Sequence, residues 1–281
     1  MKILLPLANP NTAADLVRIA AGIIHTGAGE ALALGVVEVP ENQSLAEGAV
    51  LARQQRRLLQ KVLDIGQAEN VEIETVVRIA RRAWQGIKDE VIEENVDLVL
   101  MGWHGEMKRE DRLFGETIEE LVKDPPCDIA VVKQRGLDRI QRILLPARGG
   151  RHAELALKIA ASISNSFAAS VTVLHVQPEG ANQDNPNAET AFDEFAHHCR
   201  DVCRVRLITV RSNSVAAAIL AEARKHDLVI MGATERPEII ADYLFGPIPE
   251  EVVAKAETTA IVVKSHDFRV KENPGAVSGR A

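Results

Sequence analysis

The chain alternates between short runs dominated by apolar residues and longer segments of mixed polarity. Apolar runs that are closed by turn residues are typical of strands buried on both faces of a parallel sheet. The expected strands are residues 3–7, 32–39, 71–77, 96–101 and 129–133 in the first half of the chain, and 142–146, 170–176, 206–210, 227–231 and 260–264 in the second half.

Between these runs, apolar residues recur at intervals of three and four, as in amphipathic helices. Asn11 and Thr12 are expected to cap the first helix, because their side-chain oxygens can accept hydrogen bonds from free backbone N–H groups. That helix should run to about residue 24, and the others over residues 46–68, 83–93, 117–123, 152–163, 189–202, 214–225 and 250–255. Regular alternation of strand and helix predicts an α/β fold with a parallel sheet and helices on both faces.

The second half of the chain repeats the first. Lys-Ile-Leu-Leu-Pro at the start returns as Arg-Ile-Leu-Leu-Pro, and Asp-Leu-Val-Leu-Met-Gly returns as Asp-Leu-Val-Ile-Met-Gly. Matching positions are 140 residues apart at Pro6 and Pro146, and 130 apart at Gly102 and Gly232. Offsets of this size indicate a duplicated domain, because the repeats of solenoid proteins are far shorter.

The repeat divides the chain into two domains. The sequence predicts two tandem, doubly wound, parallel five-stranded sheets, one in domain 1 at residues 1–135 and one in domain 2 at residues 136–266. The tail at residues 267–281 is polar and lacks periodicity, so we expect it to be disordered.

Composition narrows the classes of function. The 281 residues carry a net charge of −7 and only 3% aromatic residues, which argues against a nucleic-acid partner held by phosphate neutralisation and base stacking. The sequence has no uninterrupted apolar run of about 18 residues, so no membrane insertion is expected. The apolar start of the chain reads as a first strand rather than a signal peptide. Three cysteines fit a reducing cytoplasm.

A glycine pattern follows the fourth expected strand. Gly102 comes directly after the strand, Gly105 follows after two residues, and Gly115 follows after nine more. Backbone N–H groups in such a turn from strand to helix can hold a phosphate, and ligands of doubly wound sheets bind beyond the carboxyl ends of strands. In the second half Gly232 is kept, but Glu235 stands in place of the second glycine.

These residues resemble the universal stress protein family, whose hallmark is Gly-x-x-Gly, nine residues, and then Gly-Ser or Gly-Thr. The resemblance covers nearly the whole chain in two copies, and it implies that the fifth strands pair across the repeats to form an intrachain pseudo-dimer. It also implies that ATP or ADP binds in domain 1, with or without Mg²⁺. The implied binding residues are Gly102, Gly105, Gly115, Thr117, Pro6 and Val37, with Val36 as an alternative to Val37.

Several positions depart from the family pattern. Nucleotide-binding members carry an Asp after the first strand, where this chain has Ala8, and Glu116 stands where Ser or Thr follows the last glycine. In domain 2, Glu235 adds a negative charge and Pro247 lacks an N–H at the distal phosphate position, so no nucleotide is expected there. A nucleotide-free module that regulates or scaffolds another protein therefore stays open as the alternative.

The motifs Gly-Trp-His-Gly and Leu-Phe-Gly-Pro-Ile-Pro-Glu resemble the tandem stress-protein modules of some prokaryotic amino-acid permeases and chloride channels. This implies a cytoplasmic regulatory module whose partner is a membrane transporter or another protein, and a homodimer of the two-domain chain is compatible with it. Walker, Gly-x-Ser-x-Gly and His-Glu-x-x-His motifs are absent from the sequence, so no enzymatic activity is expected.

Histidines and cysteines gather once, at His197, His198, Cys199 and Cys203. Residues four apart share a helix face, which is compatible with a zinc site. No second cluster with ligand spacing lies nearby, so a helix with partly buried cysteines is favoured and no metal is expected. Cys127, at the entry to a strand, is expected in the core.

Overall fold

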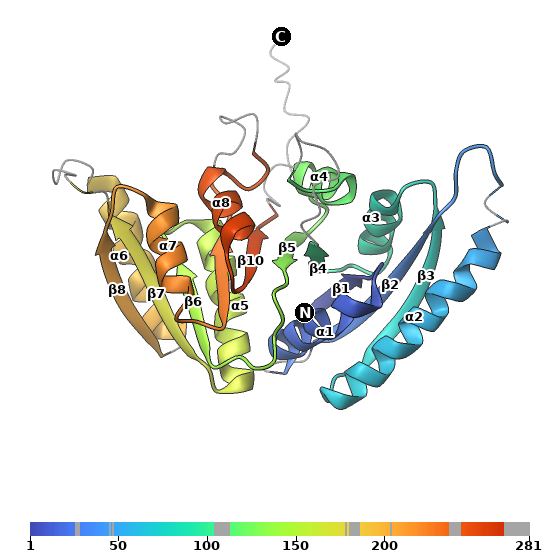
Figure 1. Cartoon of the computed structure of the whole chain (residues 1–281), viewed down its shortest axis with the longest axis horizontal. Coiled ribbons are helices and arrows are strands. Elements are labelled where there is room, and N and C mark those ends of the chain that lie inside the picture. Colours follow the sequence, from blue (N-terminus) through green and yellow to red (C-terminus); the bar gives the residue numbers. More distant parts are fainter. Residues whose placement is uncertain are drawn as a thin grey trace, which may run out of the picture.

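The computed structural model describes residues 1–25, 29–44, 46, 48–103, 113–177, 179, 186–202, 204–235 and 243–266. The apolar runs of the sequence form strands β1 (Lys2–Pro6), β2 (Glu30–Glu38), β3 (Ile73–Ala80), β4 (Leu98–Trp103), β5 (Asp128–Lys133), β6 (Arg142–Pro146), β7 (Ser170–Gln177), β8 (Val205–Arg211), β9 (Leu228–Gly232) and β10 (Thr259–Lys264). They build one ten-stranded sheet in the order β3-β2-β1-β4-β5-β10-β9-β6-β7-β8 (Figure 1).

The two halves of the chain meet at β5 and β10. Neighbouring strands are parallel within each half, whereas β5 and β10 pair antiparallel, with Val132 opposite Ile261. The expected pairing of the fifth strands is confirmed, and the two five-stranded sheets are one continuous sheet. Because the halves run in opposite directions, the carboxyl ends of their strands lie at opposite edges of that sheet.

Amphipathic helices cover both faces of the sheet (Figure 1). The core of one face includes apolar residues of α1 (Pro10–Ile24), α2 (Gly48–Ala68), α5 (Arg151–Phe167) and α6 (Pro186–Val202). The core of the other face includes those of α3 (Ala83–Glu93), α4 (Glu116–Lys123), α7 (Val215–Ala223) and α8 (Pro247–Lys255). In the part of the chain that the structure describes, no helix is long and apolar enough to cross a membrane. The tail at residues 267–281 lies outside the described residues.

The first helix differs from its expected start. It begins at Pro10, so Asn11 and Thr12 lie inside its first turn, and the prediction that they cap it is wrong. Proline suits the first helical position, because its missing N–H would have no partner there in any case. The Thr12 hydroxyl instead donates to the Asn9 carbonyl at 3.0 Å.

In each half, an aspartate accepts hydrogen bonds at the edge of the sheet where the strands begin. Asp97 accepts a hydrogen bond from the backbone N–H of Lys2 at 2.7 Å, and Asp227 accepts from those of Gln141 and Arg142 at 3.0 and 2.9 Å. Burial would raise the pKa of Asp227, but the hydrogen bonds from Arg142 and from the two N–H groups together lower it. The aspartate at the start of each repeated Asp-Leu-Val motif therefore links the start of that strand to the start of the neighbouring strand.

Candidate functional site

The candidate site lies at the carboxyl edge of the first half. β1 lies between β2 and β4, and the chain leaves β1 for a helix on one face but leaves β4 for a helix on the other. Such a switch point opens a crevice beyond the strand ends in doubly wound sheets. Pro6 ends β1, and Gly102 is the penultimate residue of β4. The structure therefore brings these two predicted residues to the same edge.

Gly115 is the N-cap residue of α4, at the entrance to the helix. Its φ of −78° and ψ of 163° are ordinary extended values, and a Cβ at this position would meet no described atom within 4 Å. Neither the backbone conformation nor the packing of the described chain therefore requires glycine here. Thr117 follows, half-buried, in the first turn of the helix. Gly105 lies outside the described residues.

Val37 lies near the carboxyl end of β2, past the point where Pro6 pairs with Leu34. Its side chain is buried and packs with Ala52 of α2, so it belongs to the core, and its backbone remains at the strand-end edge. Val36 faces the opposite side of the sheet and is half-buried.

In the second half, two side chains that follow β9 pack against the N-cap glycines of α8 and α5. The Thr234 side chain lies against Gly246, which has a φ of 104°, and the contact leaves no room for a Cβ. The Glu235 carboxylate lies equally close to Gly150, at the start of α5, and pairs with Arg151 at 3.5 Å. A helix N-terminus favours negative charge. Glu235 therefore occupies the place where an external anion would otherwise be attracted.

Aromatic rings connect the two glycine-capped helices. Phe114 precedes Gly115, Phe245 precedes Gly246, and the two rings meet edge to face with centroids 5.3 Å apart. Trp103 packs on Phe114 at a centroid distance of 4.9 Å. The sequence Leu-Phe-Gly, which occurs in both halves, places a phenylalanine before each N-cap glycine, but the sequence alone gives no sign that the two rings meet.

Lys133, at the end of β5, is a buried lysine beside this cluster. It is 6% exposed, and its Nζ lies 4.3 Å from the centre of the Trp103 ring. Burial, with Arg135 nearby, lowers the pKa of its ammonium group. The equivalent Lys264 in the second half instead donates to the Val122 carbonyl at 2.8 Å. The first half therefore holds a cation against an aromatic face where the second half has a hydrogen bond.

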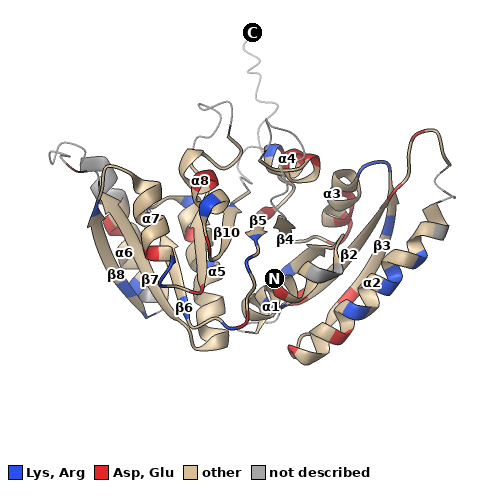
Figure 2. Ribbon diagram, viewed as in Figure 1, with Lys and Arg blue, Asp and Glu red and all other residues tan. Residues whose placement is uncertain are grey.

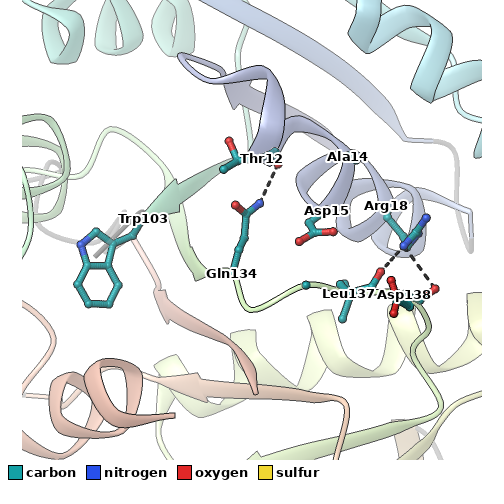
Figure 3. Close-up of a pocket in the computed structure, with 9 residues that line it drawn as sticks. Thr12, Ala14, Asp15, Arg18, Trp103, Gln134, Leu137 and Asp138 are labelled. Atoms are coloured by element: carbon teal, nitrogen blue, oxygen red, sulfur yellow. Dashed lines mark hydrogen bonds between the residues drawn. The ribbon is translucent and has the colours of Figure 1, made fainter. Parts of the chain in front are cut away.

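A cavity of about 570 Å³ lies at the same edge, between α1 and the segment that links the two halves (Figure 3). Its lining includes Thr12, Asp15, Trp103 and Gln134. The Gln134 amide donates to the Thr12 carbonyl at 2.7 Å, and burial raises the pKa of the Asp15 carboxyl. Of the predicted site residues, none in the described chain lines this cavity, and sequence reasoning missed it because the linker had no recognisable motif.

Cys199 does not share an exposed helix face with the neighbouring histidines. On α6, His197 and His198 are exposed, whereas Cys199 is fully buried; Cys203 lies outside the described residues. Among the residues with described positions, no group of side chains could hold a metal ion. The placement of Cys127 in the core is confirmed, and burial raises the pKa of its thiol to about 12.

A model of the universal stress protein family matches residues 1–133 and again residues 139–264. The chain belongs to the universal stress protein family. Each match spans one half of the continuous sheet, so the chain is a tandem member, as its sequence indicated.

Solved structures share this architecture. A universal stress protein from Archaeoglobus fulgidus superimposes with a TM-score of 0.69 at 16% identity, covering 93% of this chain and 97% of that one. The cytoplasmic domain of a prokaryotic cation chloride cotransporter gives a TM-score of 0.58 at 14% identity, covering 94% and 95%. These likenesses establish the tandem fold.

One curated relative is a membrane protein by name. A Na(+)/H(+) antiporter from Synechocystis sp. is 23% identical to this universal stress protein over 266 residues, which are 92% of this chain and 38% of the antiporter. The chain therefore spans well under half of the length of that relative.

Proposed function

We propose that this tandem universal stress protein is a cytoplasmic regulatory module that binds ATP or ADP in domain 1 and no nucleotide in domain 2. The observation that supports it is the contrast between Gly115 and Gly246. Gly246 has a positive φ and Thr234 against it, so the fold requires glycine there. Within the described residues Gly115 has neither constraint, and its position at the N-terminus of α4 suits a phosphate bound by backbone N–H groups.

In the proposed site, the base of the nucleotide lies at the ends of β1 and β2, and its phosphates lie near the end of β4 and the N-terminus of α4. Gly102, Gly105 and Gly115 would approach the phosphates through their backbones, and Thr117 would add a hydroxyl donor. The backbone at Pro6 and Val37 would flank the base. Glu116 is exposed at the first position of α4, so its carboxylate has room to turn toward solvent or to share Mg²⁺ with the phosphates. We propose binding without turnover, because no nucleophile or general base is assigned to this site.

Calorimetry with ATP, ADP and AMP, each with and without Mg²⁺, tests the proposal. One nucleotide should bind per chain, and Gly105→Glu, which copies Glu235 into domain 1, should abolish binding. Glu235→Asp is the matched control, because it alters the equivalent position of domain 2, keeps the negative charge there and should leave the wild-type affinity intact. The absence of heat at millimolar nucleotide contradicts the proposal. Retained affinity in Gly105→Glu would place the nucleotide elsewhere.

A second candidate is a nucleotide-free module that regulates a membrane transporter. The match of nearly the whole chain to part of an antiporter supports it. The test is recovery of partners from detergent-solubilised membranes of the native host, identified by mass spectrometry. Recovery of a transporter in equal amounts by wild type and Gly105→Glu, without added nucleotide, favours this candidate. Recovery that requires ATP favours a nucleotide-dependent regulator.

A further inference from the structure

The outward face of α2 carries a row of basic side chains. Arg53, Arg57 and Lys61 follow one another at intervals of four residues, so they share one side of the helix and extend over about 12 Å. Arg56 lies beside them, and all four side chains are exposed. We call these four residues the basic row. Figure 2 shows Lys and Arg positions along α2, at one end of the molecule.

The basic row forms no ion pair within the described chain, although the exposed Asp64 lies three residues beyond Lys61 on the same helix. None of its four cations forms an ion pair or hydrogen bond with any residue that the structure describes. Three exposed cations of the second half do pair with neighbouring acids: Arg224 with Glu257, Lys225 with Glu222, and Lys255 with Glu251. Arg206 and Arg211 on β8 are also exposed and have no such pair among the described residues. The basic row is therefore free to meet an anion from outside.

Neither composition nor the duplicated fold explains the basic row. The whole chain has a net charge of −7, so a cluster of cations runs against its overall balance. Like charges four residues apart on a helix repel each other and weaken it. The equivalent helix of the second half, α6, exposes Asp193, Glu194, His197 and His198, and Arg200 is its only Lys or Arg. The second half thus folds without a basic row, and the first half folds despite the repulsion between the cations of its row.

We propose that the basic row holds this face of the protein against anionic phospholipid headgroups at a membrane surface. Residues 53–61 contain no acid, Gln54 and Gln60 among them are exposed and uncharged, and Asp64 is the first acid beyond Lys61. The segment therefore presents only positive charge to an anionic plane. Each Lys or Arg near such a surface adds attraction that decays within a Debye length.

The chemistry of membrane proteins favours lipid over a transporter loop as the occupant. One relative of this chain is an antiporter by name. Short cytoplasmic loops of membrane proteins carry an excess of Lys and Arg, which would repel the basic row. The complementary charge at such a surface is that of the lipid headgroups.

Co-sedimentation with vesicles tests this proposal. The wild type should bind vesicles of phosphatidylcholine mixed with phosphatidylserine, should not bind phosphatidylcholine alone, and should be released by salt. Arg53→Gln, Arg57→Gln and Lys61→Gln together should lower the partition coefficient by roughly a hundredfold. The matched control is Arg224→Gln, Lys225→Gln and Lys255→Gln, which removes the same charge from the second half and should bind nearly as the wild type does.

Three outcomes overturn the proposal: equal binding to both kinds of vesicle, no binding to either, and equal losses in the two triple variants. Binding to polyglutamate without binding to vesicles would also overturn it, since it assigns the basic row to an acidic polypeptide. Circular dichroism confirms that the variants fold. Because the basic row is separate from the nucleotide site, calorimetry on the same triple variant distinguishes a failure of this proposal from a failure of nucleotide binding.

Discussion

The Glu235 carboxylate lies 3.5 Å from the guanidinium of Arg151, in the first turn of α5. This position puts a negative charge where a helix N-terminus favours an anion. Both side chains are more than 40% exposed, so the pair itself contributes at most about 1 kcal/mol to stability. Its larger consequence is that the Glu235 carboxylate already lies at the N-terminus of α5, where an anion from solution would otherwise be attracted.

Glu235→Gly should open the second crevice to a small anion. Without this carboxylate, the N-terminus of α5 keeps only Glu154 as an acid in its first turn, so inorganic phosphate should raise the melting temperature of the variant more than that of the wild type. Thermal unfolding in phosphate and in chloride at equal ionic strength measures the difference. Glu235→Gln, which keeps the bulk and removes the charge, should fall between the two. An identical phosphate response in all three proteins would contradict the prediction.

Gly115→Ala and Gly246→Ala should differ in stability although they change equivalent positions. At Gly115 the backbone is extended and a methyl group meets no described atom, so the free energy of unfolding should fall by at most about 1 kcal/mol. At Gly246 a positive φ and the contact with Thr234 should cost roughly 2–4 kcal/mol. Denaturant unfolding measures both, and equal losses would remove the argument that Gly115 is kept for a ligand.

The fold could be predicted from the sequence because hydrophobic periodicity is local and occurs twice. β6 and α3 begin and end where the apolar pattern placed them, and the resemblance to the universal stress protein family implied that the fifth strands pair. The first helix start was misplaced because two local rules compete there: polar residues favour a cap, but Pro10 favours the first helical position.

Only those site residues that lie near one another in the sequence could be predicted from it. Gly102 and Gly115 were found through their spacing. The contact of Glu235 with Gly150, and the position of Lys133 over Trp103, depend on side-chain positions across strands and helices. One sequence carries no signal for such contacts, because only the packed fold brings these residues together.

Lys133→Met should leave the protein at least as stable as the wild type near neutral pH. The lowered pKa means that the charged form of Lys133 is less favourable in the folded protein than in the unfolded chain, so the cost of burying the charge exceeds the gain from the Trp103 ring. We expect a gain of about 1 kcal/mol in the free energy of unfolding. Urea unfolding provides the measurement.

The pH dependence separates this effect from simple repacking. Wild-type stability should rise as pH rises through the lowered pKa of Lys133 and stop rising above the unfolded value of 10.5; Lys133→Met should lack this rise. Lys264→Met is the matched control and should lose about 1 kcal/mol, because it removes the hydrogen bond to Val122. A Lys133→Met protein less stable than Lys264→Met would show that the cation stabilises the fold.

Asp227→Asn should lower the free energy of unfolding and make it depend less on pH in the acidic range. The hydrogen bonds from Arg142 and Gln141 lower the pKa of Asp227 below 3.8, so the unfolded chain binds more protons than the folded one in that range. This stabilisation is present above the unfolded pKa and is lost as pH falls through the folded one. The variant should lose about 1–3 kcal/mol of unfolding free energy near neutral pH.

Urea unfolding of wild type and Asp227→Asn, near neutral pH and at several values below about pH 4, measures the difference in unfolding free energy and the direction in which it changes with pH. The difference between wild type and Asp227→Asn should shrink as the solution becomes more acidic, because the wild-type carboxyl then becomes neutral as well. Arg142→Gln should lose less, since the backbone N–H groups of residues 141 and 142 still reach the carboxylate. A constant difference across the whole range would show that Asp227 acts through packing and not through its charge.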